Sequence, residues 1–199
     1  CRSSSHLNDE TLEKLAAFCH VSPEAVMSAH DVPNIYHVPL MLYEQGLCDI
    51  LKLDCNATDV LKHWRVMAYH LDTLSEEIHI AMVGKYTNLS DAYLSVIKSL
   101  QHAAMAVDRK LVIDWIEASH LESDWEDADE REQAWESLKQ AAGILVPGGF
   151  GDRGVEGKIL AAGYARTSST PYLGICLGLQ VATIEFCRNV LGFEDSNST

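Results

Sequence analysis

The sequence predicts an α/β protein built on a doubly wound parallel sheet, preceded by a small tail of a second domain. From residue 78 onward, four short apolar segments alternate with amphipathic ones, as strands and helices do in parallel sheets. Residues 1–55 instead hold short helical pieces that together bury little apolar surface. We therefore divide the chain into a domain tail (1–55), a linker helix (56–77) and the first part of a sheet domain (78–199).

The composition is that of an ordinary globular protein, with 47% hydrophobic and 22% charged residues and a net charge of −14. An acidic chain repels phosphates, so we expect no nucleic-acid or membrane partner. An apolar run long enough to span a membrane and an apolar signal segment are both missing from the sequence. The cysteines show neither a C-x-x-C pair nor Cys–His metal spacing, which predicts no metal site, a reducing compartment and a cytoplasmic location. These are Cys1, Cys19, Cys48, Cys55, Cys176 and Cys187.

The first 55 residues predict three short helices and one strand. Residues 8–19 begin with a capping sequence at Asn8 and keep one apolar face. A second helix start follows at Ser22-Pro23, because proline favours the first helical position. Residues 30–36 resemble a loop that enters a short strand, and a helix then runs from Pro39 to a stop at Gly46.

Residues 56–76 predict one amphipathic helix. Its apolar residues recur every three or four positions, which places them on a single stripe. A linker helix packed on a neighbouring domain explains this pattern better than a membrane helix does. The stripe consists of Val60, Trp64, Met67, Leu71 and Leu74.

The remaining chain supplies the sheet. Between the strands, the acidic residues 122–132 predict a solvated loop and a helix start. Loops at the carboxyl ends of parallel strands form the ligand sites of such sheets. We expect strands at 78–84, 111–116, 143–146 and 171–176, and helices from Ser90 to Leu100, over 134–141 and 156–166, and after Cys176.

A cysteine lies where the last predicted strand turns into a helix. Gly174 and Gly178 flank Cys176 at two residues on either side, which lets the backbones pass closely at a sharp corner. Unpaired N–H groups and the helix dipole favour a thiolate there. A buried, inert cysteine is the alternative, and we prefer it for Cys187 in the middle of the following helix.

The glycine-rich loop 147–151 leaves the preceding strand at the same edge. One of its N–H groups, together with the N–H of Leu177, would form an oxyanion hole beside a nucleophile. Alone, this loop is equally consistent with a flexible turn. The charges of Arg153, Glu156 and Lys158 form either a lid that meets a ligand or the solvated start of a helix. All nine histidines precede Cys176, so a general base in the usual position after the nucleophile is not visible.

These motifs are similar to those of the class I glutamine amidotransferases, and among them the chain resembles the CTP synthases of eukaryotes. The resemblance covers essentially all 199 residues. Its strongest segments are 83–87, 91–96, 146–157, 174–180, 186–192 and 195–199, and in the first part Cys1-Arg2-Ser3, His30-Asp31-Val32, Ile35-Tyr36 and Val38-Pro39.

The resemblance implies a flavodoxin-like glutaminase sheet, preceded by the end of a P-loop-type synthetase domain. It implies a cytoplasmic ligase of pyrimidine biosynthesis that aminates UTP to CTP with ATP and Mg²⁺, using ammonia from glutamine. GTP would be the activator, CTP both product and inhibitor, and the assembly a homotetramer that forms filaments.

By resemblance, Cys176 is the glutaminase nucleophile. Glutamine binding is implied for Gly149, Leu177, Gly178, Leu179 and Gln180. A lid that responds to GTP is implied for Phe150, Arg153, Gly154 and Glu156. Nucleotide contacts are implied for Lys14, His30, Asp31 and Val32, with Arg2 near the nucleotide.

The family's phosphate loop and metal-binding acids would precede residue 1, and its catalytic His and Glu would follow Thr199. We therefore expect a segment of a longer enzyme that is inactive by itself. The alternatives are another class I amidotransferase, such as GMP synthase, and a non-catalytic assembly fragment.

Overall fold

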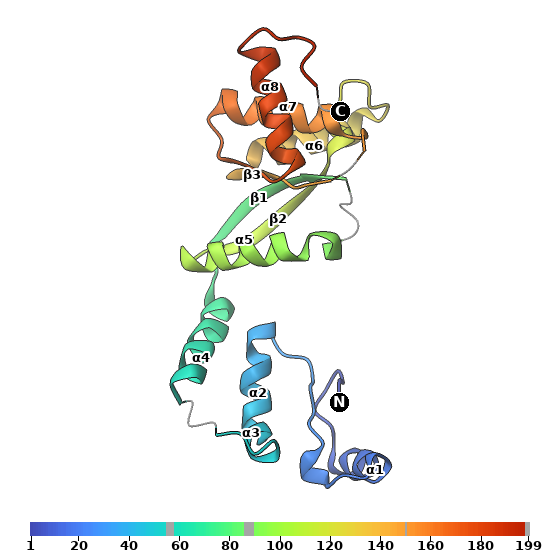
Figure 1. The fold of residues 1–199 in the computed structure, drawn as a ribbon, viewed down its shortest axis with the longest axis vertical. Helices are drawn as coiled ribbons and strands as arrows, with labels where there is room; N and C mark the ends of the chain where they lie inside the picture. Colours follow the sequence, from blue (N-terminus) through green and yellow to red (C-terminus); the bar gives the residue numbers. More distant parts are fainter. Residues whose placement is uncertain (55–57, 86–89, 150, 198–199) are drawn as a thin grey trace. The chain divides into compact units, whose positions relative to one another are not determined.

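The computed structural model describes residues 1–54, 58–85, 90–149 and 151–197. The chain divides into two compact units, Cys1–Leu74 and Ser75–Thr199, whose elements are labelled in Figure 1.

The first unit is a set of short helices. The Asn8 side chain accepts the Thr11 N–H at 2.9 Å and so caps the first helix, as the sequence predicts. The elements are α1 (Asp9–Cys19), η1 (Pro23–Ala25), η2 (Ile35–His37), α2 (Val38–Glu44), α3 (Leu47–Ile50) and α4 (Thr58–Thr73).

One local prediction in this unit is wrong, one is only partly correct, and one helix was not predicted. The segment expected to enter a strand forms the 3₁₀ turn η2, because the Asn34 side chain accepts the Tyr36 N–H at 2.9 Å and caps a turn. The helix start at Ser22-Pro23 yields only the single turn η1. Gly46 ends α2 as predicted, with a φ of +83°, but the chain then re-enters a helix as α3, which the sequence did not indicate.

Helix α4 packs within the first unit, against η2 and α2. Ala68 on this helix is fully buried, and its carbonyl oxygen accepts a hydrogen bond from the Asn34 side chain at 3.0 Å. The Trp64 ring contacts Tyr36 edge-on, with centroids 6.1 Å apart. Over the ranges given above, none of the helices combines the length and apolar character that crossing a membrane requires.

The second unit confirms the doubly wound parallel sheet. Its strands are β1 (Glu77–Gly84), β2 (Lys110–Glu117), β3 (Gly143–Val146) and β4 (Tyr172–Gly174), all parallel in the order β2-β1-β3-β4. Figure 1 shows α5 (Leu94–Ala106) on one face of the sheet and α6 (Ala128–Gln140), α7 (Val155–Ser168) and α8 (Leu177–Asn189) on the other. Two short turns, η3 (Ser90–Tyr93) and η4 (Ala118–Leu121), follow β1 and β2.

Alternate residues of the central strands divide between the two faces. Ala81 and Val83 join the core under α6, α7 and α8, whereas Met82 and Leu145 join the smaller core that α5 covers. All of these side chains are almost fully buried, so the sheet is covered on both faces.

The sequence predicts a buried strand over 171–176, and this is only partly correct. The strand is limited to β4, and Leu173 and Ile175 are 54% and 40% exposed. β4 is the last strand in the order of the described sheet, so its apolar side chains have no further strand beside them. Tyr172 is held inward, where its hydroxyl donates to the Gly178 carbonyl oxygen at 2.8 Å and burial raises its pKa.

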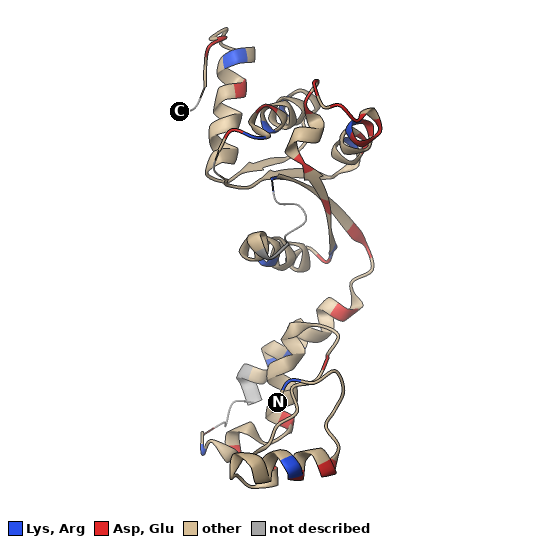
Figure 2. Ribbon diagram, turned by 90° about the vertical axis from the view of Figure 1, so that its right-hand side faces the viewer, with Lys and Arg blue, Asp and Glu red and all other residues tan. Residues whose placement is uncertain are grey.

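The acidic stretch forms a solvated loop and a helix start, as predicted. The Asp127 side chain accepts the N–H groups of Asp129 and Glu130, each at 3.0 Å, and caps α6. Figure 2 shows the acidic residues along this loop and helix in red.

The cysteines differ in one respect from the expectation of single thiols. Cys1, Cys19 and Cys176 are free and exposed, and Cys187 is free and partly buried. Cys48 is disulfide-bonded, which the sequence did not predict, because spacing alone does not reveal pairs that tertiary folding creates.

Helices α7 and α8 are joined by an ion pair between the exposed Arg166 and the buried Glu185, which gives the fold a testable pH dependence. Arg166 contacts both carboxylate oxygens of Glu185, at 2.9 and 2.7 Å. Glu185 is only 2% exposed, and its hydrogen bonds with Arg166 lower the pKa of its carboxyl. A carboxyl whose pKa is lowered on folding stabilises the fold above its unfolded-state pKa, and this contribution disappears as the pH falls.

We therefore expect Glu185→Gln to destabilise the protein by about 2 kcal/mol at pH 7, because charge-assisted hydrogen bonds are lost. Urea unfolding at pH 7 and near pH 4 measures this, and the difference from wild type should shrink at the lower pH. The matched control is Glu136→Gln at an exposed position of α6, which should change little at either pH. A difference that does not depend on pH would contradict the assignment to the ion pair.

Candidate functional site

The cysteine between β4 and α8 has a strained backbone conformation. Cys176 has a φ of +54° and a ψ of −108°, a conformation that costs energy for any residue with a side chain. The preceding Ile175 N–H donates to the Val146 carbonyl oxygen at 2.9 Å, which fixes the corner to the end of β3. The thiol is exposed, so the predicted sharp turn presents it to solvent.

Both flanking glycines are sterically required. A Cβ at Gly174 would lie 2.5 Å from the carbonyl carbon and oxygen of Gly178. A Cβ at Gly178 would lie 2.0 Å from the Val146 carbonyl oxygen. The G-x-C-x-G spacing therefore has the close-packing origin that the sequence suggests.

The glycine-rich loop lies beside the thiol. A Cβ at Gly148 would be 3.4 Å from the Cβ and 3.8 Å from the Sγ of Cys176. Leu177 is the first residue of α8, a position whose N–H has no acceptor within the helix. The two sources of an oxyanion hole are thus neighbours of Cys176, and which N–H groups hold an oxyanion stays a prediction.

The residues implied in glutamine binding divide by exposure. Leu177 and Gly178 are buried in the first turn of α8, whereas Leu179 and Gln180 face solvent. Gly149 is partly buried and follows the loop residue that contacts the thiol. The structure therefore brings all five into the surroundings of Cys176.

The residues implied in the lid are tied to the body of the second unit. Arg153 donates to the Lys85 carbonyl oxygen at 2.8 Å and pairs with Glu117 at 3.2 Å. Glu156 pairs with Arg188 of α8 at 2.9 Å. Gly154 has a φ of +74°, and a Cβ there would lie 2.9 Å from the Cβ of Ala118. Phe150 lies outside the described residues.

Two buried lysines lie behind the glycine loop, and the sequence did not identify either as buried. The Lys85 ammonium donates to the Gly151 carbonyl oxygen, and burial lowers its pKa. Lys158 is fully buried, so the expectation that it belongs to a solvated helix start is wrong. The first turn of α7 packs closely against η4, because a Cβ at Gly157 would lie 1.7 Å from the Ala118 carbonyl oxygen. The next residue, Lys158, lies in this closely packed turn and points into the interior.

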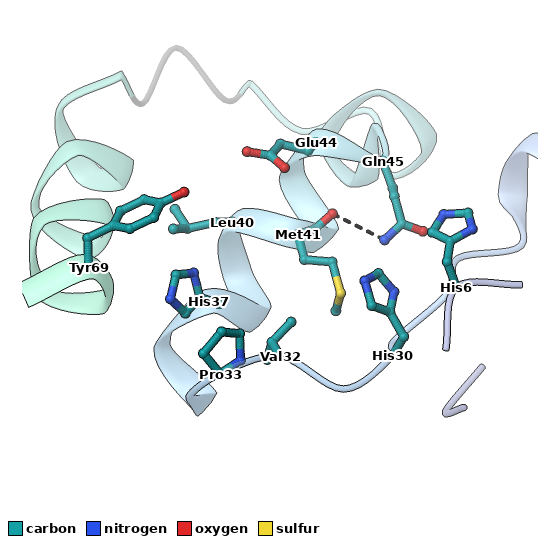
Figure 3. A pocket seen from close by; sticks show the side chains of 10 residues that line it. All are labelled: His6, His30, Val32, Pro33, His37, Leu40, Met41, Glu44, Gln45 and Tyr69. Carbon is teal, nitrogen blue, oxygen red and sulfur yellow. Dashed lines mark hydrogen bonds between the residues drawn. The ribbon is translucent and has the colours of Figure 1, made fainter. Parts of the chain in front are cut away.

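The residues implied in nucleotide binding lie in the first unit, and only some of them line the same pocket. His30 and Val32 line a pocket of about 330 Å³, which Figure 3 shows with the side chains that surround it. Asp31 pairs with Arg2, and Lys14 pairs with Glu10 on the exposed side of α1. Neither Asp31 nor Lys14 is among the lining residues.

The same pocket has lining residues that the sequence did not single out. His6 contacts the His30 ring at 5.3 Å between centroids, and His37 lies 2.7 Å from an oxygen of Asp72. No spacing in the sequence joins these side chains, because they come from a loop, a 3₁₀ turn and a helix that meet only on folding. In Figure 3, the His30 and His37 imidazoles lie on the side of the pocket away from Glu44, and His6 is drawn next to Gln45.

An exposed cysteine on a strained strand-to-helix corner, beside a glycine loop on a parallel sheet, is suited to nucleophilic attack on an acyl carbon. This fold and site define the class I glutamine amidotransferases. The family model described as "Glutamine amidotransferase class-I" matches residues 88–198, more than half of the chain. The chain belongs to this family.

Within that class, the similarity is to CTP synthases. The model "CTP synthase N-terminus" matches residues 1–56. The CTP synthase of Dictyostelium discoideum is 51% identical over 217 residues, and CTP synthase 1 of Homo sapiens is 48% identical over 207 residues. These alignments cover 100% of this chain but 38% and 35% of the relatives, so the chain spans little more than a third of their length.

A solved structure supports the assignment of the sheet domain. The structure entitled "Trypanosoma brucei CTPS - glutaminase domain with bound acivicin" matches with a TM-score of 0.54 and 43% sequence identity. The match covers 61% of this chain and 44% of that chain.

Proposed function

We propose that the chain supplies the glutaminase nucleophile of a CTP synthase, a ligase that aminates UTP to CTP with ammonia released from glutamine. The observation that supports this most strongly is the strained, exposed Cys176 on a class I amidotransferase sheet, in one chain with a segment that matches the CTP synthase N-terminus.

In the proposed reaction, the Cys176 thiolate attacks the side-chain carboxamide carbon of glutamine. A C–S bond forms, and the carbonyl oxygen becomes an oxyanion that the N–H groups of Leu177 and the glycine loop stabilise. The C–N bond then breaks as the nitrogen takes a proton, and ammonia leaves. Water cleaves the thioester, which releases glutamate and restores the thiol.

The first unit would contribute to the nucleotide site. The pocket lined by His30 and Val32 has the size and the mixed polar and apolar lining that suit a nucleobase, and we assign it to the adenine of ATP. ATP would activate UTP for attack by ammonia. Mg²⁺ binding, GTP activation through Arg153 and Glu156, CTP inhibition, tetramers, filaments and a cytoplasmic location are parts of the same proposal.

Acivicin, which is bound in the Trypanosoma brucei glutaminase domain, is a suitable probe. We expect incubation of the full-length protein with acivicin to abolish CTP formation from glutamine and to modify the peptide that contains Cys176. Excess glutamine should protect that peptide, because both compounds would occupy one site. Peptide mass spectrometry and a CTP assay measure the two effects. Modification that glutamine does not slow, or that falls on another cysteine, would contradict the proposed site.

A further inference from the structure

We propose that Lys158 is a positioning residue that acts across the glycine loop, where its positive charge favours the thiolate form of Cys176 and the oxyanion formed next to it. This inference rests on the proposed function, in which Cys176 is the nucleophile. Two observations support it: the burial of the lysine without a hydrogen-bond partner within the described ranges, and its position relative to the thiol.

The first observation is that Lys158 is buried without a hydrogen-bond partner among the described residues. Its side chain is fully buried in the first turns of α7, and its ammonium nitrogen has no hydrogen-bond partner in the described part of the chain. Burying an ammonium group without hydrogen bonds is costly. An apolar side chain of similar volume would fill this place at lower cost, so packing alone does not account for the lysine.

The second observation is the arrangement around the loop. A Cβ at Gly148 would lie 3.8 Å from the Sγ of Cys176, and a Cβ at the next residue, Gly149, would lie 3.7 Å from the Lys158 ammonium nitrogen. Adjacent residues of one glycine segment thus approach the thiol and the buried cation. Since neither glycine has a side chain, these two residues place only backbone atoms between the thiol and the ammonium group.

The charges near Lys158 leave a positive excess on this side of the loop. Lys85 after β1 is the cation that acts on Lys158, and Glu117 at the end of β2 is the carboxylate that acts on both lysines. Arg153 and Asp152, both after the loop, act on Lys85 with opposite signs, so the three cations exceed the two carboxylates by one charge. Burial, followed by the repulsion of Lys85, lowers the pKa of Lys158 to about 8, while Glu117 opposes the shift. Lys158 therefore keeps most of its charge at neutral pH.

An electrostatic role and a packing role predict opposite results for Lys158→Met in the full-length protein. The variant removes the charge and keeps most of the volume. We expect the pH midpoint for alkylation of Cys176 by iodoacetamide to rise by about 0.5 or more, since one nearby charge is lost. We also expect the melting temperature to stay equal or to rise. The alkylation rate is followed from pH 5.5 to 9 on the Cys176 peptide by mass spectrometry, which separates it from Cys1 and Cys19.

The matched control is Lys139→Met on the exposed side of α6, which makes the same change in net charge away from the loop and should leave the midpoint unchanged. Lys158→Gln, uncharged but polar, should raise the midpoint as Met does, and it replaces the Met variant if that variant does not fold. An unchanged midpoint in the folded Lys158 variants, or an equal rise in the Lys139 variant, would overturn the inference.

Alkylation requires no glutamine turnover, so a negative result for Lys158 can be distinguished from a failure of the proposed function. If Cys176→Ala kept full activity with glutamine, the proposed function would be wrong even where the Lys158 variants shifted the midpoint. If Cys176 proved essential and the midpoint did not move, only the role of Lys158 would be wrong.

Discussion

Replacing Cys176 by alanine is expected to abolish CTP formation from glutamine in the full-length protein, while CTP formation from added ammonia stays within about twofold of wild type. Removal of a catalytic nucleophile lowers turnover by up to about 10⁶-fold, which leaves no measurable glutaminase reaction. Ammonia added to the solution bypasses this step, because the proposed amination of UTP does not involve the thiol. Chromatographic assay of CTP with glutamine or an ammonium salt as nitrogen source measures both.

Cys187→Ala is the matched control for this experiment. It removes a second free thiol from the same helix, α8, but at a partly buried position away from the corner. Both activities should survive in this variant. If Cys176→Ala reduced the glutamine and ammonia reactions equally, the separation of a glutaminase site from a synthetase site would be wrong.

The second large effect is expected from Gly178→Ala. The added Cβ would lie 2.0 Å from the Val146 carbonyl oxygen, and a backbone atom at the end of a central strand cannot move aside as a flexible side chain can. To relieve this clash, either α8 or the end of β3 must move. We expect a loss of about 3 kcal/mol or more, a fall in melting temperature of about 10 °C, and loss of the glutamine-dependent reaction.

Gly192→Ala separates the collision from the general loss of a glycine. Gly192 has a φ of +77°, but apart from its chain neighbours no atom of the described residues lies within 4 Å of its Cβ position. We expect only the strain of a positive φ, about 1 kcal/mol, and unchanged activity with glutamine. Thermal melting and the CTP assay compare the two variants. Equal destabilisation by both would show that the contact with Val146 is not what makes Gly178 necessary.

The sheet could be predicted because its signals are local. The apolar runs that become β1, β2 and β3 are separated by amphipathic segments, and parallel pairing follows from that alternation. The corner at Cys176 could also be predicted, since glycines at fixed spacing report a close backbone approach. Class membership followed from the same residues.

Features that depend on tertiary packing could not be predicted. The exposure of Leu173 depends on what lies beside β4, and the disulfide at Cys48 depends on how the first unit folds. Lys158 was interpreted as a surface or ligand-facing charge, because lysine is normally exposed. Only the approach of α7 to η4 shows that this lysine is buried, and no periodicity in the sequence encodes that approach.

The contact between the corner at Cys176 and the end of β3 determines which nearby positions tolerate substitution. The Val146 carbonyl oxygen accepts the Ile175 N–H and lies against Gly178. Point mutations replace side chains but leave carbonyl oxygens in place, so position 146 can exchange one β-branched residue for another without altering this support. The tolerance for change is therefore uneven: the glycines permit almost no replacement, whereas the strand beneath the nucleophile can diverge while the thiol keeps its geometry.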